Sequence, residues 1–125
     1  MIKIEVKELK KILEKHKLWL EGKGGERADL SFVDLRSADL RYADLRFANL
    51  SSAHLRSANL RSADLRSADL SSADLGFADL SFADLSSANL CYANLRSADL
   101  SLTDFRSANL RSVKMFNGWK LIKDE

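Results

Sequence analysis

The residues that could do chemistry are few, and they lie far apart in the sequence. The two histidines, His16 and His54, have no cysteine or second histidine nearby, and a zinc site needs several such ligands together. The single cysteine, Cys91, has no histidine within five residues that could help to form its thiolate. Serines are abundant, but none stands in a Gly-x-Ser-x-Gly turn. The sequence therefore predicts no catalytic residue, no metal site, no cofactor and no enzymatic activity.

A five-residue repeat must position these side chains. From residue 28 to residue 112, leucine recurs at every fifth position through seventeen consecutive repeats, with Phe105 as the one substitute. Alanine stands two places before each leucine, except at Val33 and Thr103. Asp or Asn stands one place before the leucine, except at His54. The motif is A-(D/N)-L-x-x, and we name its two x positions the first and the second corner place.

A period of five fits neither a continuous helix nor a continuous strand. On an α-helix of about 3.6 residues per turn the leucines would move around the axis, and on an unbroken strand an odd period would put them on alternating faces. Each repeat must therefore contain its own turn. The alanine and the leucine share one face of a short extended segment and point inward, while the Asp or Asn between them points outward. Repeated turns of the same sense predict a solenoid with an interior of leucine and alanine.

Repeats such as A-D-L-R-S and A-N-L-S-S resemble those of the pentapeptide-repeat family, and the resemblance covers 85 of 125 residues. It implies an all-β solenoid, a right-handed quadrilateral β-helix with four repeats, hence twenty residues, in each coil. On that geometry the array makes a little over four coils and is roughly 20 Å long, at about 4.8 Å per coil. Residues twenty apart would then stack, so one interior column would hold Leu30, Leu50, Leu70, Leu90 and Leu110.

The second corner place departs from the commonest pattern of that family, in which glycine stands there. It is serine in ten repeats and Phe32, Tyr42, Phe47, Phe77, Phe82, Tyr92 or Leu102 in the other seven. Type II turns need a positive φ at this place, which glycine tolerates and aromatic residues do not. We therefore expect corners of type I or of irregular type. The uniformity of the repeats is compatible with a natural chain and also with an engineered, consensus-like one.

A solenoid leaves an open core and unpaired strand edges at both ends, so we expect a cap on each. Residues 1–27 form the predicted N-terminal cap, in which Ile2, Ile4 and Val6 alternate like a short strand. Apolar residues at three- and four-residue spacings then predict an amphipathic helix over about residues 6–21. Three glycines at 22, 24 and 25 would end this helix and form a hinge into the first coil. The stretch is similar to leaders that precede the repeats in bacterial family members.

Residues 113–125 form the predicted C-terminal cap, because the motif decays there and several apolar residues follow. Two interpretations of this segment remain open. One is a small plug on the last coil. The other is a self-association patch that makes a homodimer, since several members of the family dimerise through their C-terminal ends. The residues concerned are Met115, Phe116, Trp119, Leu121 and Ile122.

One column of carboxylates would run along the implied stack. Carboxylates about 4.8 Å apart are potential ligands for Mg²⁺ or Ca²⁺. Three of them are followed two positions later by an arginine, which favours local charge neutralisation, and the carbonyl-rich loops of calcium sites are missing. We therefore expect no metal here. The column consists of Asp44, Asp64, Asp84 and Asp104, and the arginines are Arg46, Arg66 and Arg106.

An acidic belt with exposed aromatic residues is the best candidate for a partner surface. No arginine stands at a first corner place between Arg66 and Arg96, and aromatic residues occupy second corner places in the same stretch. Exposed aromatic residues and an uneven charge are typical of protein-interaction sites. Alternatively, the corner aromatics pack on the neighbouring coil, as Phe82 would on Leu102. The candidate residues are Phe77, Phe82, Tyr92, Asp69, Asp74, Asp79 and Asp84.

Composition limits the function classes. With 46% apolar residues, 30% charged residues and a net charge of +2, the chain reads as one soluble domain with no marked affinity for nucleic acid or membrane. The start lacks the pattern of a signal peptide, no stretch reaches membrane-spanning length, and the lone thiol suits a reducing compartment. We therefore expect a cytoplasmic location.

The leading functional hypothesis is a non-enzymatic structural solenoid scaffold. The alternative is a protein-interaction module that resembles the DNA-mimicking, gyrase-protecting members of the family. The repeats carry eleven Asp and nine Arg, which disfavours the alternative, because a DNA mimic must present a dense run of negative charge.

Overall fold

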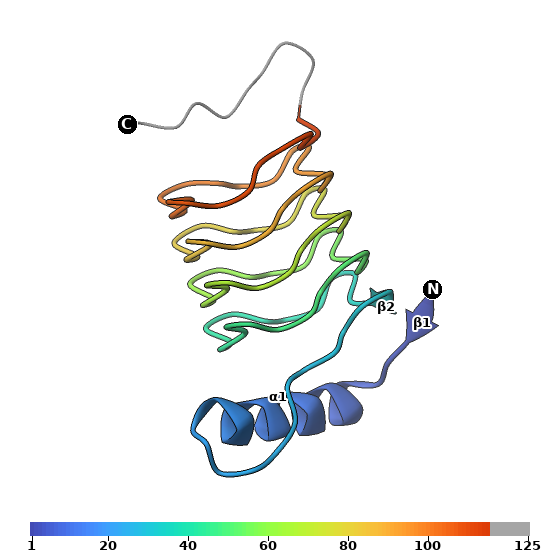
Figure 1. Ribbon diagram of the computed structural model, residues 1–125. Helices are drawn as coiled ribbons and strands as arrows, with labels where there is room; N and C mark the ends of the chain where they lie inside the picture. The colour runs from blue at the N-terminus through green and yellow to red at the C-terminus, as the bar shows by residue number, and fades with distance from the viewer. Residues whose placement is uncertain (116–125) are drawn as a thin grey trace.

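The computed structural model describes residues 1–115, which form a stack of coils closed at one end by a helix (Figure 1). In chain order the elements are β1 (Ile2–Lys3), α1 (Val6–Leu20) and β2 (Val33–Asp34). From β2 onward the chain climbs away from α1 through a regular series of turns and single-residue bridges. We name residues 28–67 the lower coils and residues 68–107 the upper coils, as they lie in Figure 1.

Each repeat makes one tight turn, and four turns complete a coil. The N–H of the alanine donates to the carbonyl of the preceding leucine, as from Ala38 to Leu35 at 3.0 Å. After twenty residues the chain lies one coil higher, where Asp44 forms a parallel bridge with Asp64 and Asp64 with Asp84. The predicted twenty-residue coil is therefore confirmed.

Leucine and alanine fill the interior of the stack. Every repeat leucine from Leu30 to Leu95 is at most 2% exposed. Burial of each leucine side chain contributes roughly 1.5–3 kcal/mol before chain entropy is subtracted. In the last described coil the core residues Leu100, Phe105 and Leu110 are half-buried, because no further coil of residues 1–115 covers them. The core thus runs through the whole stack and weakens at its C-terminal end.

The corners are not of the predicted kind. Every second corner place has a positive φ, between 55° at Leu102 and 64° at Phe47, although none of these residues is glycine. A positive φ at the third residue of a turn is the mark of type II, so the prediction of type I or irregular corners is wrong. The physical reason is the ladder between coils, in which the N–H at each second corner place from Phe32 to Tyr92 donates to a carbonyl of the coil above, as from Phe77 to Arg96 O at 3.0 Å. These bonds and the buried leucines outweigh a conformational cost of roughly 1–2 kcal/mol per corner.

The N-terminal segment covers the open end of the stack. The predicted helix is confirmed as α1, whose Leu9 is buried while Ile12 and Leu13 pack against the core. Strand β1 pairs in parallel with β2 and so covers an edge of the first coil. Gly25 has φ +71°, and a Cβ there would overlap the carbonyl oxygen of Lys15, so only glycine fits this hinge. None of the helices within residues 1–115 has the length and apolarity to cross a membrane.

Candidate functional site

The Asp or Asn of each repeat closes a turn with its own side chain. Its Oδ1 accepts a hydrogen bond from the backbone N–H at the first corner place, as in Asp29 with Ser31 at 3.1 Å and Asn109 with Arg111 at 3.1 Å. That N–H is not part of the ladder between coils, so the side chain satisfies it. The sequence analysis placed these residues outward and gave them no role in the turns. The signal it missed was the restriction to Asp and Asn, whose short side chains bond to the backbone two residues later.

In the lower coils an arginine at the first corner place grips the carboxylate beside it. Arg36 donates through Nε and Nη2 to both oxygens of Asp34 at 2.9 Å, and Arg41 does the same to Asp39 at 2.8 Å. These side-chain hydrogen bonds lower the pKa of both aspartates to about 2. Such charge-assisted forks neutralise the surface of the lower coils.

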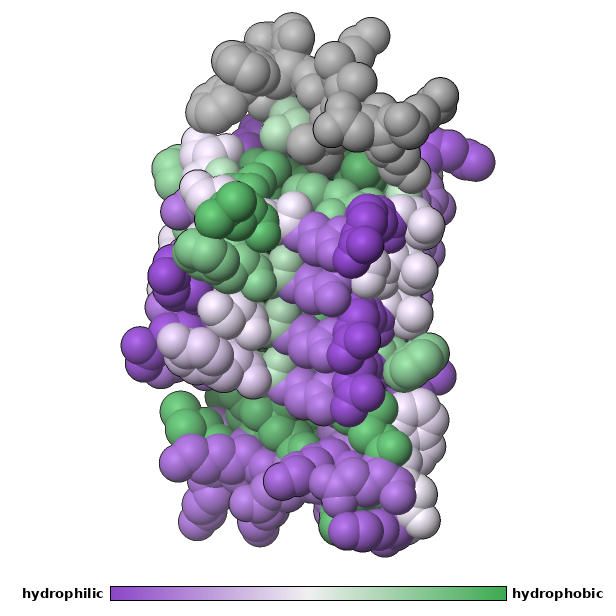
Figure 2. All heavy atoms as spheres, turned by 90° about the vertical axis from the view of Figure 1, so that its left-hand side faces the viewer, coloured by the Kyte–Doolittle hydropathy of each residue, from purple (hydrophilic) through white to green (hydrophobic). Residues whose placement is uncertain are grey.

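Arginine side chains form ion pairs along the predicted carboxylate column, both within a coil and between coils. Arg46 binds Asp44 at 2.8 Å and lies 3.7 Å from Asp64 in the coil above, and Arg66 binds Asp64 at 2.6 Å and lies 3.7 Å from Asp84. The hydrogen bond from Arg46 lowers the pKa of Asp44. The expected charge neutralisation is confirmed, and Figure 2 shows such stacked side chains as a vertical hydrophilic stripe. Within residues 1–115, no three His, Cys, Asp or Glu side chains are grouped to hold a metal ion.

Few first corner places of the upper coils hold an arginine. Serine or glycine follows five of their six aspartates, and the exception is Arg106, which binds Asp104 at 2.6 Å. A serine hydroxyl can donate a hydrogen bond, as Ser101 Oγ does to Asp99 at 2.6 Å, and this bond lowers the pKa of Asp99. It does not cancel the charge. The upper coils hold six Asp and two Arg, whereas the lower coils hold five Asp and six Arg, so the negative charge is concentrated in the upper half.

The structure spreads the predicted partner residues around the stack. Consecutive repeats occupy consecutive faces, so the four carboxylates lie on four different faces of one coil. Those carboxylates are Asp69, Asp74, Asp79 and Asp84. Phe77 and Phe82 occupy the two corners that flank Asp79, whereas Tyr92 lies on the corner diagonally opposite Phe82. Only Phe77, Asp79 and Phe82 are therefore brought together on one face.

Two corner aromatics are covered by arginines. The guanidinium of Arg56 lies 4.7 Å from the ring centroid of Phe77, and that of Arg61 lies 4.6 Å from the centroid of Phe82. Both arginines reach up from the coil below. A Cβ at Gly76 would press on the Arg56 guanidinium, so the missing side chain makes room for it. These cation–π contacts were not predicted, because they join residues 21 positions apart.

His16 joins α1 to the first coil. It is completely buried, its Nδ1 accepts from the Ala28 N–H at 2.9 Å, and its Nε2 lies 2.9 Å from the carbonyl oxygen of Arg46. Both bonds are satisfied by a neutral ring that carries its proton on Nε2. Trp19 stacks on this ring at 5.7 Å and meets Phe47 edge-on. Burial lowers the pKa of His16 and so keeps the ring neutral. Because both ring nitrogens are engaged and buried, His16 holds α1 on the first coil.

The remaining chemical candidates stay isolated. Cys91 is half-buried on an outward corner and forms no disulfide. His54 takes the place of an Asp or Asn and bridges by its backbone to Asp34 and Asp74. Of the predicted C-terminal self-association residues, Met115 is half-buried against the core, and the other four lie outside the described residues.

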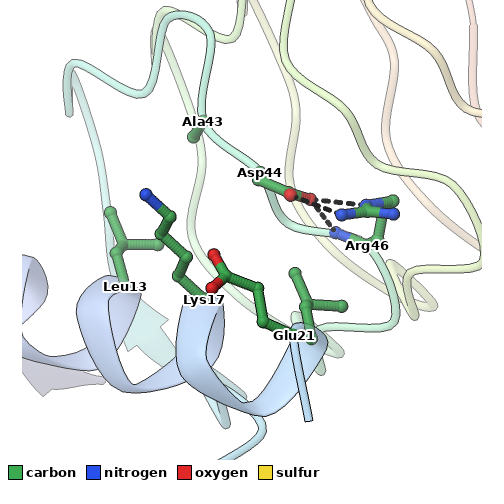
Figure 3. Close-up of a pocket in the computed structure, with 7 residues that line it drawn as sticks. Leu13, Lys17, Glu21, Ala43, Asp44 and Arg46 are labelled. Carbon is green, nitrogen blue, oxygen red and sulfur yellow. Dashed lines mark hydrogen bonds and ion pairs between the residues drawn. The ribbon is translucent and has the colours of Figure 1, made fainter. Parts of the chain in front are cut away.

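A groove of about 310 Å³ lies between α1 and the first coil (Figure 3). Figure 3 shows Lys17 and Glu21 of α1 on one side and Asp44, engaged by Arg46, on the other. None of the lining residues is a histidine, a cysteine or a serine, and the one aspartate, Asp44, is held by Arg46. It is lined by Leu13, Lys17, Leu20, Glu21, Ala43, Asp44 and Arg46.

Comparison with known proteins agrees with the coil. The family model for pentapeptide repeats matches residues 28–66, 48–85 and 83–117. The chain belongs to the pentapeptide-repeat family. A search of the curated proteins found no match.

Several solved pentapeptide-repeat structures are similar. A thylakoid-lumen protein of Arabidopsis thaliana is 39% identical, with a TM-score of 0.67 over 69% of this chain and 60% of its own. HetL of the cyanobacterium Nostoc, involved in the regulation of heterocyst differentiation, is 45% identical, with a TM-score of 0.70 over 75% of this chain and 43% of its own. A further Nostoc protein is 32% identical, with a TM-score of 0.67 over 91% of this chain and 97% of its own. This chain spans about 60% of the first of these relatives and less than half of HetL.

Proposed function

We propose that the chain is a non-enzymatic scaffold, a right-handed quadrilateral β-helix whose outer faces present side chains to other molecules. The observation that carries this proposal is that side chains fill the interior of the stack. Leucines that are at most 2% exposed fill it from Leu30 to Leu95, so the repeats expose a convex surface. Catalytic sites are concave and enclose their substrates.

The polar groups of the repeats support the same function. Their aspartates and asparagines close turns, and in the lower coils the arginines beside the aspartates neutralise them. Such groups have structural partners and are not poised for acid–base chemistry. HetL, a relative with a described regulatory role, is also consistent with action through binding.

Exchange of outward residues tests the scaffold. Ser51→Arg and Ser71→Arg, alone and together, should leave the circular dichroism spectrum and the melting temperature nearly unchanged, because arginine stands at the first corner place in nine repeats. The parent should also give no turnover of nitrophenyl ester, phosphate or glycoside substrates above buffer. Turnover that is lost in Cys91→Ser or His54→Asn would contradict a scaffold.

The alternative, a DNA-mimicking gyrase partner, is less well supported by these charges. The excess of carboxylates is confined to the upper coils, and arginines break up the carboxylates of the lower coils. A supercoiling assay with purified gyrase should show no inhibition at micromolar protein. Inhibition there would favour the decoy over a scaffold with a different partner.

A further inference from the structure

An exposed apolar corner rises through the upper coils between the face of Asp79 and the face of Asp84. Phe82 and Leu102 follow one another along it, because the Phe82 N–H donates to the carbonyl of Ser101 at 2.9 Å. Their side chains are 48% and 75% exposed. Figure 2 shows apolar side chains gathered in the upper half beside the hydrophilic stripe. Apolar side chains that meet on a surface mark interaction sites, whereas single scattered ones do not. We name this pair the Phe82–Leu102 corner.

The ring of Phe82 is held in place before any partner arrives. Arg61 lies 4.6 Å from the ring centroid, and its Nη1 donates to Ser81 Oγ at 3.0 Å. Ser81 in turn donates to Asp79 Oδ1 at 2.5 Å. Arg61 reaches the ring from the coil below, while about half of the side chain stays exposed. A fixed aromatic side chain loses little entropy on binding and is therefore a good anchor.

The charges beside this corner select the partner. Three carboxylates on the two adjoining faces lack an arginine fork, because serine follows each of them. They are Asp79, Asp84 and Asp99. On the same two faces of the lower coils, arginine forks hold Asp39, Asp44 and Asp64. Asp84 keeps only the longer ion pair with Arg66 at 3.7 Å. The carboxylates beside the exposed corner are therefore less neutralised than those on the same faces below, and they complement a cation.

We propose that the Phe82–Leu102 corner docks a positively charged segment of another protein, in which an apolar side chain is flanked by lysine or arginine. This inference rests on the proposed scaffold function and names the chemistry of its partner. The same carboxylates repel nucleic-acid phosphates and anionic lipid headgroups. Contact with so few side chains buries less than a standard interface, so a short segment binds with a dissociation constant on the order of 100 µM.

The apolar half of the proposal is tested with a fluorescein-labelled octapeptide of three lysines, two leucines and three glycines. Fluorescence anisotropy should show binding to the full chain, and Phe82→Ser with Leu102→Ser should weaken it about tenfold. Tyr42→Ser is the matched control, because Tyr42 lies in the same column, is 73% exposed and borders gripped carboxylates. It should leave binding unchanged. Equal binding by the parent and the double variant, or by the peptide with glycine for leucine, would overturn the proposal.

The electrostatic half is tested by isosteric substitution. Asn closes the same turns at 49, 89, 94 and 109, so Asp→Asn removes charge and keeps the fold. The triple variant D79N/D84N/D99N should bind the peptide about tenfold more weakly and with less dependence on salt. The control triple D39N/D44N/D64N, on the same faces of the lower coils, should retain parental affinity. Parental affinity of D79N/D84N/D99N for the peptide would contradict the electrostatic part of the proposal.

Two further measurements test whether another occupant covers this corner. If a second copy covers the corner, sedimentation of the parent shows a dimer that Phe82→Ser with Leu102→Ser dissociates. If the chain's own C-terminal segment covers it, Trp119→Ser with Leu121→Ser tightens peptide binding. Either result overturns the proposed partner. A parent that binds no peptide, while its serine-to-arginine variants fold normally, refutes the docking site and leaves the scaffold intact.

Discussion

The lower and upper coils share one buried core up to Leu95, and up to that point they differ on the outside. Leu60 and Leu80 lie in the same interior column and are both 0% exposed. Outside, Arg66 grips Asp64, whereas Ser86 stands at the same place one coil above and leaves Asp84 without a fork. The comparison teaches that the alanine, the leucine and the Asp or Asn specify the coil. The corner places are free to set charge and exposure.

The shared core gives the largest expected effect. Leu60→Ala and Leu80→Ala should each lower the free energy of unfolding by about 2–5 kcal/mol, because each leaves a cavity in a filled interior. Leu100→Ala, one coil further and half-buried, should lower it by less. Chemical denaturation followed by circular dichroism measures all three. Equal losses at the three positions would contradict the weakening of the core toward its end.

The cap formed by α1 lies at the lower end, and His16 should make its docking pH-dependent. Burial lowers the pKa of His16, as do the charges of Arg27 and Arg46, while the hydrogen bond to the Arg46 carbonyl and the charge of Asp44 raise it. The unfolded chain, with its histidine pKa near 6.5, therefore takes up a proton before the folded chain does. Stability should be full above pH 6.5 and fall below it, by up to about 1.4 kcal/mol per pH unit.

Thermal unfolding between pH 7.5 and pH 5 measures this dependence. His16→Gln should flatten the profile in that window, and His54→Asn, the control at the other histidine, should keep it. The aspartates gripped by arginine lose their contribution only at lower pH, since the pKa of Asp34 and Asp39 is about 2 when folded. If His54→Asn alone flattens the profile, the pH dependence does not come from His16 and the prediction is wrong.

Both halves should respond alike to a change of corner residue. Ser52 and Ser87 have φ values of 56° and 60°, so Ser52→Gly and Ser87→Gly should each raise the free energy of unfolding by up to about 1 kcal/mol. Ser51→Gly, at a first corner place without positive φ, should lower it instead. Denaturant titration of the three variants settles the sign. Destabilisation by all three would mean that the corners store no strain.

One repeat of the lower coils lacks the side-chain turn bond. His54 has no carboxylate or amide oxygen to offer the N–H of Arg56, so His54→Asn should stabilise the chain by about 1 kcal/mol. Asn59→His makes the opposite exchange and should destabilise it by a similar amount, because Asn59 accepts from the Arg61 N–H at 3.1 Å. Melting temperatures of the two variants should therefore move in opposite directions.

The smallest expected effect compares one carboxylate from each half. Asp64→Asn removes the fork from Arg66 but keeps the turn acceptor, and should lower the melting temperature slightly. Asp84→Asn removes only the longer ion pair with Arg66 at 3.7 Å and should lower it less. Calorimetry at low and high salt measures the difference, which salt should reduce. A larger drop in melting temperature for Asp84→Asn than for Asp64→Asn would contradict the conclusion that arginine neutralises the lower carboxylate more strongly.

The five-residue period was enough to predict a coil with inward leucines, and the family resemblance implied its twenty residues. Apolar residues at three- and four-residue spacings predicted the N-terminal helix. It could not predict the corners, because local preference at Phe77 opposes a positive φ. What decides the conformation there is the bond from the Phe77 N–H to the carbonyl of Arg96, 19 residues away. A ladder between coils overrode a preference that holds for an isolated turn.

The candidate site was predicted less well, because neighbours along the chain lie on different faces. Asp74 and Asp79 are five residues apart and face different sides, whereas Phe82 and Leu102 are twenty residues apart and meet on one corner. The cover of Arg56 over Phe77 likewise joins two coils. Sequence reasoning that follows the chain finds the belt, and only the register between coils shows which of its members a partner can touch.

The register of twenty also governs how such a rod can change its length. Duplication or loss of twenty residues would return each later residue to its own column, as the bridge from Asp44 to Asp64 shows for one coil. Duplication of five residues would turn everything beyond it by a quarter of a revolution. A surface built across coils, such as the pair of Phe82 and Leu102, would then be split if the duplication fell between them, although no residue of the surface had mutated.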